Sequence, residues 1–376
     1  MARPVGKRFL AVLGAFTLLS ASFFLGWWWC IGCWVTVVAI WHSGLWADRP
    51  RVAHTTVTHT KGRSGDRPFF TVDWVAGEMQ GWRRTMEDAY LAMVNLPSGW
   101  TSRASASRSR PPGTSDAMLF AVFDGHGGST VSGAARNWLP DRVARGLAEN
   151  AGDTARALRN CFVELDKELR RVGKSQAQKQ GVLSNPACNG RNAFDQMGCT
   201  AVVVLVLGRQ IFCANVGDSR ALLCRQGTTI ELNKIHKPED EAEKKRILAA
   251  GGRVKRHGPC FRVDGGLNLS RALGDFAYKD ASLCAEQHKI CAVPDVKELT
   301  LSRDDEFLVV ACDGLFELLQ PDQVIRFIRE RLTRPDADVE AIVADLLREA
   351  CTKDPHASGG KGTDNETVII VRLHWT

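Results

Sequence analysis

Acidic residues stand beside strand-like apolar runs at several points of this 376-residue chain. The clearest is Asp124, which follows the uninterrupted apolar run 117–123 and precedes Gly125-His126-Gly127-Gly128. A run of this length is typical of a strand buried on both faces, so Asp124 is predicted where such a strand reaches solvent. Glycines lack Cβ, and their backbone can approach a ligand closely. An Asp-Gly pair alone usually marks only a turn, so an argument for chemistry depends on repetition.

Three further apolar runs carry acids at one end: Glu87-Asp88 before residues 89–96, Asp313 after 306–312 and Asp364 before 367–373. If these strands are neighbours, the carboxylates form one cluster whose mutual repulsion calls for cations. Oxygen ligands favour Mg²⁺ or Mn²⁺ over zinc. Two such ions can bind a water, lower its pKa and hold a phosphoryl oxygen. This chemistry needs no serine or cysteine nucleophile.

The middle of the chain supplies further strands. Four strand-like runs follow one another with links of two or three residues: 199–207, 210–216, 220–224 and 228–232. Because such links are too short for a helical crossover, consecutive runs are expected to pair antiparallel.

Helices are expected around these strands. Ser129 is placed to cap a helix that runs to about Leu139, where Pro140 would end or kink it. Apolar residues recur with period 3.6 in two C-terminal segments, which predicts two amphipathic helices there. The other expected segments are helices over 152–172 and 239–250, a polar loop over 173–197 and a surface insertion over 100–116.

The N-terminal region contains 33 consecutive residues, 9–41, without a charged residue or histidine. That length is sufficient for a membrane-spanning helix. A cleaved secretory signal is the alternative, but the apolar run continues past the possible cleavage site at Ser20-Ala21-Ser22. The segment is therefore expected to remain as a tilted helix, or as a hairpin bent near Gly26 or Gly32.

Charge and cysteine usage limit the class of partner. Most of the formal charge of +7 lies in residues 1–67, so the remaining chain is close to neutral. This distribution argues against nucleic-acid binding and suits a chain held near anionic lipid. Several of the twelve cysteines lie in strand-like runs, which suits buried, unpaired thiols in a reducing compartment. The chain after the membrane segment is therefore expected to face the cytosol.

Nine stretches form a distinctive series: GWRRTMEDAY, FAVFDGHGG, MGCTAVVV, ANVGDSRALL, HKPEDEAEKKRILAAGG, LNLSRALGDFAYK, VPDV, VVACDGLFELL and GTDNETVIIV. In this order, the chain from about residue 75 to 373 resembles the metal-dependent protein serine/threonine phosphatases, the PPM or type-2C family. The resemblance implies an α+β fold in which two antiparallel β-sheets pack face to face and are flanked by α-helices, here with an N-terminal membrane segment. The expected organisation is a basic N-terminus (1–8), a membrane segment (9–41), a basic linker (42–70) and a phosphatase catalytic domain (71–376).

The resemblance also implies a metal site. Asp124 would bridge two Mg²⁺ or Mn²⁺ ions. The Gly125 carbonyl and Glu87 would bind one of these ions, and Asp313 and Asp364 would bind the other.

Three further residues would act on water and substrate. Asp88 would support the metal-bound waters, and Arg83 would hold the substrate phosphate with its planar cationic fork. His126 would protonate the leaving serine or threonine alkoxide. The plainer alternatives are a surface cation for Arg83 and a turn residue for His126.

One position departs from the family pattern. Family members usually continue Gly-(Ile/Leu)-Trp-Asp after the strand-ending Asp, whereas this chain has Gly314-Leu315-Phe316-Glu317. The usual Asp helps Asp218 and Asp313 to hold a weaker third metal ion. Glu317 keeps the charge on a side chain one methylene longer, which puts the third site in question.

The sequence therefore predicts a membrane-anchored, Mg²⁺- or Mn²⁺-dependent protein phosphatase that hydrolyses phosphoserine and phosphothreonine by attack of a metal-activated water. Its expected partners are phosphoproteins and, through the N-terminal segment, membrane lipid. The alternatives are a catalytically silent, phosphatase-like scaffold and a hydrolase of small phosphate esters. The presence of all four ligand acids, Glu87, Asp124, Asp313 and Asp364, favours an active enzyme.

Overall fold

The computed structural model describes residues 58–64, 69–96, 117–179 and 193–376. Three predicted segments lie outside these residues: the N-terminus 1–8, the membrane segment 9–41 and the insertion 100–116. Among the helices within the described ranges, none has the length and hydrophobicity that crossing a bilayer requires.

Strand β4 (Met118–Phe123) shows how the apolar runs shape the fold. Its side chains alternate between two hydrophobic cores, because successive residues of a strand point to opposite faces. Leu119, Ala121 and Phe123 enter one core, and Phe120 and Val122 enter the other. All of them are fully buried. The prediction of a strand buried on both faces is confirmed.

Two antiparallel sheets form the centre of the domain. The six-stranded sheet has the order β1 (Thr58–Arg63), β2 (Phe70–Met79), β16 (Glu366–Trp375), β15 (Asp305–Ala311), β9 (Arg220–Arg225) and β10 (Thr228–Glu231). The five-stranded sheet has the order β14 (Asp295–Thr300), β8 (Gln210–Val216), β7 (Ala201–Leu207), β4 and β3 (Ala89–Met93). Their facing surfaces share one core, to which β4 contributes Phe120, β7 contributes Val204 and β16 contributes Ile369.

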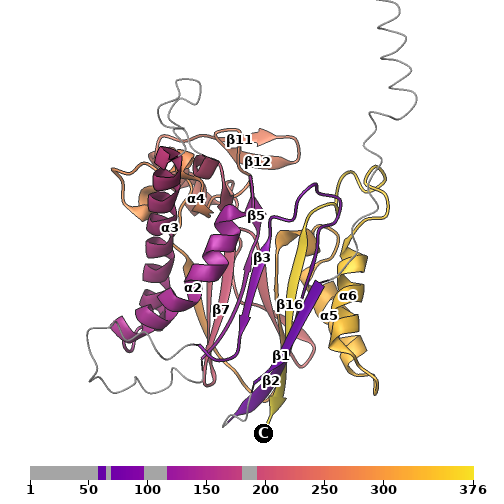
Figure 1. Ribbon diagram of the computed structural model, residues 1–376. Helices are drawn as coiled ribbons and strands as arrows, with labels where there is room; N and C mark the ends of the chain where they lie inside the picture. The colour runs from indigo at the N-terminus through magenta and orange to yellow at the C-terminus, as the bar shows by residue number, and fades with distance from the viewer. Residues whose placement is uncertain (1–57, 65–68, 97–116, 180–192) are drawn as a thin grey trace, which may run out of the picture. The chain divides into compact units, whose positions relative to one another are not determined.

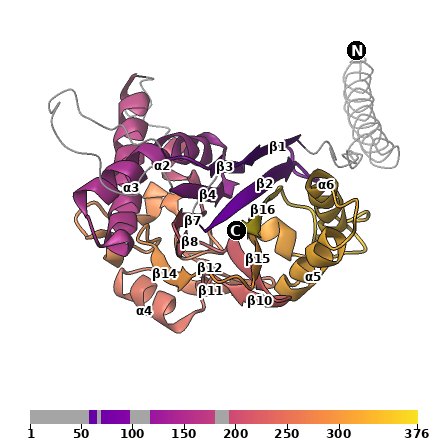
Figure 2. The same ribbon diagram turned by 90° about the horizontal axis from the view of Figure 1, so that it is seen from below.

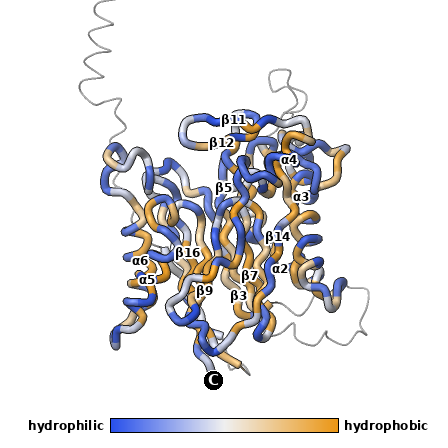
Figure 3. The backbone as a smooth tube through the Cα atoms, turned by 180° about the vertical axis from the view of Figure 1, so that it is seen from behind, coloured by the Kyte–Doolittle hydropathy of each residue, from blue (hydrophilic) through white to orange (hydrophobic). Residues whose placement is uncertain are grey.

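Helices cover the outer face of each sheet (Figures 1 and 2). Helices α2 (Thr130–Glu149) and α3 (Thr154–Lys179) pack on the five-stranded sheet, and α5 (Pro321–Leu332) and α6 (Val339–Ala350) pack on the six-stranded sheet. Hydrophobic colour follows the strands, whereas the connecting loops are largely hydrophilic (Figure 3). The four layers confirm the predicted sandwich of two sheets flanked by helices.

Smaller elements lie between the main strands. One short sheet joins β13 (Leu273–Gly274), β6 (Gly198–Cys199) and β5 (Gly125–His126). Residues 236–294, called the insertion here, contain α4 (Glu241–Ala249) and the hairpin of β11 (Val254–His257) and β12 (Cys260–Val263). The insertion has a small core of its own that includes Ile247, Val263 and Ile290. Short 3₁₀ turns are η4 (Ala193–Asp195), η5 (Phe276–Tyr278), η6 (Ala285–Gln287) and η7 (Asp313–Phe316).

The pairing expected for the middle strands is partly wrong. Strands β7 and β8 pair, and so do β9 and β10, but β8 and β9 belong to different sheets. The chain crosses between the sheets at Gly217-Asp218-Ser219, where Gly217 has φ +103°. A Cβ on Gly217 would lie 2.6 Å from Thr200, so only glycine fits this tight crossing. Asp218 is thereby placed between the ends of the two sheets.

Several predicted boundaries also differ. Helix α2 continues through Pro140 to Glu149, because Leu139 and Val143 belong to the core against the five-stranded sheet. Ser129 makes no side-chain capping bond. Helix α3 extends to Lys179, and β1 lies within the predicted linker, where it pairs with β2.

For the described residues, the prediction that the cysteines of strand-like runs are buried and unpaired is confirmed, and the predicted reducing compartment stays a prediction. Cys199, Cys213, Cys224 and Cys312 are buried and free. Burial raises the pKa of the Cys213 thiol to about 12, so that residue behaves as a small hydrophobic side chain.

Candidate active site

Five aspartates from different strand ends converge at one end of the sandwich. Burial raises the pKa of Asp124 well above its usual range, and the charges of Asp88, Asp313, Asp218 and Asp364 raise it further. Asp124 follows β4 of one sheet and Asp313 follows β15 of the other, so the cluster lies where the two sheets meet. The strand-end aspartates thus lie within electrostatic reach of Asp124, and the predicted metal site stays a prediction.

The cluster has more negative charge than its surroundings compensate. Burial, followed by repulsion from Asp218 and Asp364, raises the pKa of Asp313 to about 8. Burial raises the pKa of Asp88 to about 7, although its Oδ2 accepts a hydrogen bond from Thr367 Oγ1 at 2.8 Å. Buried carboxylates with raised pKa values are stabilised when cations are supplied.

Glu87 and Gly125 lie against each other. A Cβ on Gly125 would lie 2.1 Å from the Glu87 carbonyl oxygen, so no other residue fits without moving the backbone. Glu87 Oε2 accepts a hydrogen bond from Gly128 N at 2.9 Å, and the Glu87 carbonyl accepts one from Ser132 Oγ at 2.5 Å. The glycine-rich turn after β4 therefore brings together two of the predicted ligands.

Two cations border the cluster. Arg83 Nη2 lies 2.5 Å from Asp364 Oδ2, and 56% of the Arg83 side chain is exposed. Lys237 Nζ lies 2.5 Å from Asp218 Oδ2. Burial lowers the pKa of Lys237, but the charge of Asp218 and its hydrogen bond raise the pKa more strongly. Lys237 was not predicted, because nothing in the sequence His236-Lys237-Pro238 distinguishes it from a surface lysine.

His126 is paired with an acid that the sequence analysis missed. Its Nε2 lies 2.8 Å from Oδ2 of Asp275, a buried residue whose backbone is left-handed with φ +52°. Burial lowers the pKa of His126, but Asp275 raises it more, so the net pKa is raised. A Cβ on Gly198 would lie 2.2 Å from Asp275 Oδ2 and 2.6 Å from His126 Nε2, so glycine leaves the space for this pair. Spacing alone gives no signal for this partnership, because the two residues are far apart in the chain.

Asn365 is a second residue that was missed. Its Nδ2 donates to the carbonyls of Gln80 and Thr85 at 2.8 and 3.0 Å, and its Oδ1 accepts from Glu87 N at 2.9 Å. One amide thus joins the segment before Glu87 to the residue after Asp364. The only signal in the sequence is its place in the GTDN stretch.

Glu317 points to a loop. Its Oε2 accepts hydrogen bonds from Gly362 N at 2.6 Å and from Thr363 N at 3.3 Å. Burial raises its pKa, and Asp364 adds to the rise.

The donor set fits hard divalent metals. As the side chains stand, no three His, Cys, Asp or Glu residues among those described are grouped to hold an ion. The oxygens of Glu87, Asp218 and Asp364 are engaged by Gly128, Lys237 and Arg83 respectively. These are exchangeable polar contacts, and the raised pKa values of Asp124 and Asp313 show that they leave the central charge uncompensated. Oxygen donors with such a charge suit Mg²⁺ or Mn²⁺.

A buried, oxygen-only acid centre between the two sheets of a β-sandwich is suited to hydrolysis of phosphate esters with the help of divalent metal ions. The sequence profile described as "Protein phosphatase 2C" matches residues 72–357. Probable protein phosphatase 2C 5 of Paramecium tetraurelia is 35% identical over 331 residues, which cover 87% of this chain and 99% of that protein. Protein phosphatase 2C homolog 2 of Schizosaccharomyces pombe is 38% identical over 295 residues, which cover 78% of this chain and 70% of that protein.

Solved structures agree on the fold. The crystal structure of serine-threonine phosphatase 2C from Toxoplasma gondii superposes with a TM-score of 0.62 at 19% identity, over 84% of this chain and 99% of that one. The chain belongs to the protein phosphatase 2C family and is a protein serine/threonine phosphatase. Metal dependence is general in this family.

Proposed function

We propose that this protein is a membrane-anchored phosphatase that removes phosphate from phosphoserine and phosphothreonine in proteins and requires Mg²⁺ or Mn²⁺. The observation that carries this proposal is the buried aspartate cluster around Asp124, whose negative charge exceeds that of the cations around it. Its composition supports an active enzyme over a silent scaffold, because each predicted ligand acid is in place.

The predicted metal ligands would divide between two ions. Glu87, the Gly125 carbonyl and Asp124 would hold one ion, and Asp124, Asp313 and Asp364 would hold the other. When bound, the ions supply positive charge to the phosphate and activate a water for attack. The sequence also predicted a weaker third site at Asp218, Asp313 and Glu317, but the carboxylate of Glu317 contacts the backbone of Gly362 and Thr363 instead.

The remaining groups of the chain orient water and substrate. Asp88, held by Thr367, accepts hydrogen bonds from water at the centre. Arg83 reaches from solvent to Asp364 and binds the substrate phosphate with its free guanidinium edge. His126 donates a proton to the leaving oxygen, and Asp275 orients its imidazole and raises its pKa.

Membrane anchoring depends on residues 9–41, and the catalytic domain is proposed to face the cytosol. The apolar run, the basic flanks and the free cysteines support this topology. Protease added to sealed microsomes should digest the catalytic domain, and a tag at Met1 should also be lost if the segment forms a hairpin. Full protection of the catalytic domain would place it in a lumen.

The activity is tested with the detergent-solubilised full chain. Initial rates are measured on a phosphoserine peptide, a phosphothreonine peptide and a small phosphate ester, each with and without Mg²⁺ or Mn²⁺. We expect metal-dependent turnover of both peptides, with kcat/KM well above that for the ester. Peptide binding without turnover would establish the scaffold alternative, and turnover of the ester alone would establish the small-ester hydrolase.

A further inference from the structure

The β11–β12 hairpin carries an uncompensated group of cations. Residues 253–263 contain no acid, and their basic residues are Arg253, Lys255, Arg256, His257 and Arg262. All except Arg262 are exposed. The nearest acid in sequence, Asp264, is engaged by Lys289 Nζ and Arg253 N. Within the described part of the chain, Lys255 and Arg256 form no ion pair, so their charges are available to a partner.

This basic hairpin lies at the same end of the sandwich as the active site. Figures 1 and 3 both place β11 and β12 at the same end of the sandwich as β5, which carries His126. The thiol of Cys260, in β12, lies within electrostatic reach of Lys237, whose ammonium contacts Asp218. A peptide bound at the active site can therefore extend towards the hairpin, at about 3.3 Å per residue.

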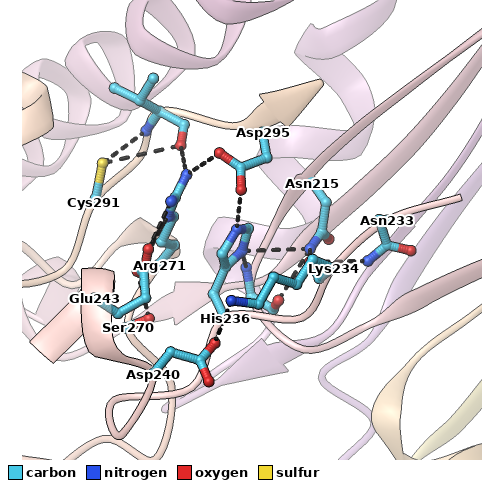
Figure 4. Close-up of polar contacts among 12 residues, drawn as sticks. Asn215, Asn233, Lys234, His236, Asp240, Glu243, Ser270, Arg271, Cys291 and Asp295 are labelled. Atoms are coloured by element: carbon cyan, nitrogen blue, oxygen red, sulfur yellow. Dashed lines mark hydrogen bonds and ion pairs between the residues drawn. The ribbon is translucent and has the colours of Figure 1, made fainter. Parts of the chain in front are cut away.

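The hairpin belongs to an insertion that is fixed to the sheets by a buried ionic network (Figure 4). Glu243, only 3% exposed, accepts hydrogen bonds from Arg246 at 2.6 Å, Arg271 at 2.6 Å and Ser270 at 2.7 Å. These bonds hold α4 to the residues that lead into β13. A carboxylate with several charge-assisted partners orders the elements that supply them.

The same network continues to the active-site turn. Arg271 Nη1 donates to Asp295 Oδ1 at 2.8 Å, and Asp295 Oδ2 lies 3.1 Å from His236 Nε2. His236 Nδ1 accepts from Gly217 N at 3.2 Å, so Nε2 is the nitrogen that carries hydrogen and donates to Asp295. Gly217 precedes Asp218, and the insertion is therefore connected directly to the crossing turn at the catalytic centre.

We propose that the β11–β12 hairpin binds acidic residues that flank the phosphorylated serine or threonine of the substrate. The proposal rests on the proposed phosphatase function and names the substrate class. Lys255 and Arg256 supply long, exposed cations for carboxylates two or more residues from the phosphate. Exposed ion pairs are weakened by salt, so the preference decreases as ionic strength rises.

The test compares two phosphopeptides that share one phosphorylated residue and differ only in flanks, either Asp/Glu-rich or Lys/Arg-rich. The full chain is assayed as wild type and as the double charge reversal Lys255→Glu with Arg256→Glu. The matched control is Arg156→Glu with Arg159→Glu, two exposed arginines at the start of α3 outside the proposed surface. Hydrolysis of a small phosphate ester, which has no flanks, reports on the catalytic centre itself.

We expect wild type to prefer the acidic peptide by about tenfold in kcat/KM, mainly through KM. The hairpin reversal should abolish or invert this preference, and the control reversal should leave it as in wild type. Equal kcat/KM for the two peptides in wild type, or an unchanged preference after hairpin reversal, would overturn the proposal. Loss of all hydrolysis in wild type would instead contradict the proposed function.

A separate observation concerns Glu317. The 3₁₀ turn η7 begins with Asp313, and Glu317 follows its last residue. The bonds from Glu317 to Gly362 N and Thr363 N join this turn to the loop that ends at Asp364. Gly362 packs closely against its surroundings, because a Cβ there would lie 2.5 Å from Leu318 and 2.7 Å from the Ala350 carbonyl oxygen.

We infer that Glu317 is a positioning residue that sets the separation of Asp313 and Asp364. The additional methylene allows its carboxylate to reach the loop, which an aspartate at the same position would not reach. This inference also rests on the proposed metal ligands.

Two conservative variants distinguish the loop contact from coordination of a third ion. Glu317→Gln keeps an acceptor oxygen for Gly362 N but loses charge, whereas Glu317→Asp keeps charge but loses reach. We expect faster amide hydrogen exchange at Gly362 and Thr363 in metal-free Glu317→Asp, with Glu317→Gln close to wild type. Calorimetry should show Mg²⁺ binding weakened about tenfold by Asp and by less than about threefold by Gln.

The exposed Glu349 of α6 provides the control, and Glu349→Asp should match wild type in both measurements. Coordination of a third ion predicts the opposite order, with a weak binding event lost in Glu317→Gln and retained in Glu317→Asp. That order, or unchanged exchange in Glu317→Asp, would overturn the inference. Absence of metal binding in wild type would contradict the proposed function instead.

Discussion

Two buried acidic sites in this protein, one around Glu243 and one around Asp124, differ in how their negative charge is compensated. Around Glu243, burial tends to raise the pKa, but the hydrogen bond from Arg271 and the charges of Arg246 and Arg271 lower it to about 2. Around Asp124, burial and four neighbouring aspartates all act in the same direction, and the pKa is raised. The first group carries its own cations and holds elements together. The second is not compensated in this way and, under the proposed function, binds ions from solution, so similar residue types would serve structure in one place and catalysis in the other.

The largest expected effect comes from removing the central acid. Asp124→Asn should lower kcat/KM on a phosphopeptide by at least about 10³, because nucleophile activation is lost. The same change should raise the thermal midpoint of the metal-free protein, since it removes a buried, repelled charge. The exposed Asp336→Asn is the control. Near wild-type turnover of Asp124→Asn would refute the two-metal mechanism.

The corresponding change in the compensated group should affect stability. Glu243→Leu leaves the largely buried Arg246 without an acidic partner and Arg271 with Asp295 alone, and urea unfolding should show a loss of about 3 kcal/mol in the free energy of unfolding. The exposed Glu241→Leu on the same helix should cost less than about 1 kcal/mol. An unfolding midpoint like that of wild type would mean that the network contributes little net stability.

The two groups should respond oppositely to pH in the metal-free protein. Raised pKa values, about 7 for Asp88 and about 8 for Asp313, mean that the folded state binds more protons than the unfolded state. This part of the stability is present in acid and is lost as pH rises through about 7 to 8. The lowered pKa of Glu243 contributes stability above about 4.5, which is lost as pH falls towards 2.

Thermal melting across pH checks this comparison. The metal-free midpoint should fall by a few degrees between pH 6 and pH 9, and saturating Mg²⁺ should reverse the fall because it favours the ionised carboxylates. A metal-free midpoint that rises over this interval would contradict an uncompensated centre.

The smallest expected effect concerns His126, which lies in the active site and is paired with the carboxylate of Asp275. Asp275→Asn removes the charge that raises the His126 pKa, so the alkaline limb of the kcat profile should move to lower pH. A pH–rate profile on one phosphopeptide measures the shift. An unmoved limb would assign the alkaline pKa to another group.

Asp88, Asp124, Asp313 and Asp364 were predictable because each stands near the end of an apolar run, whereas Asp218 came only from the family resemblance. Strand β4 shows why: its period-2 burial between two cores gives an uninterrupted apolar run, and Asp124 ends it. The family resemblance then supplied the sandwich and the roles of the residues. Asp275, Lys237 and Asn365 were not predicted, because their contacts join segments far apart in the chain and depend on backbone geometry.

The errors in the fold have similar causes. The link Gly217-Asp218-Ser219 has the length and composition of a hairpin turn, and only the packing of two sheets makes it a crossing. Pro140 reads locally as a helix stop, but burial of Leu139 and Val143 outweighs that local preference.

The position of β16 in the six-stranded sheet has a consequence for the order of synthesis. This strand pairs with β2 on one side and β15 on the other, although its residues leave the ribosome after both. During translation, β2 and β15 are made before the strand that lies between them. Asp364 stands two residues before that strand and is therefore also made late. A growing chain therefore cannot assemble the acid centre, and catalytic competence appears as a late event of folding, after nearly the whole domain has been made.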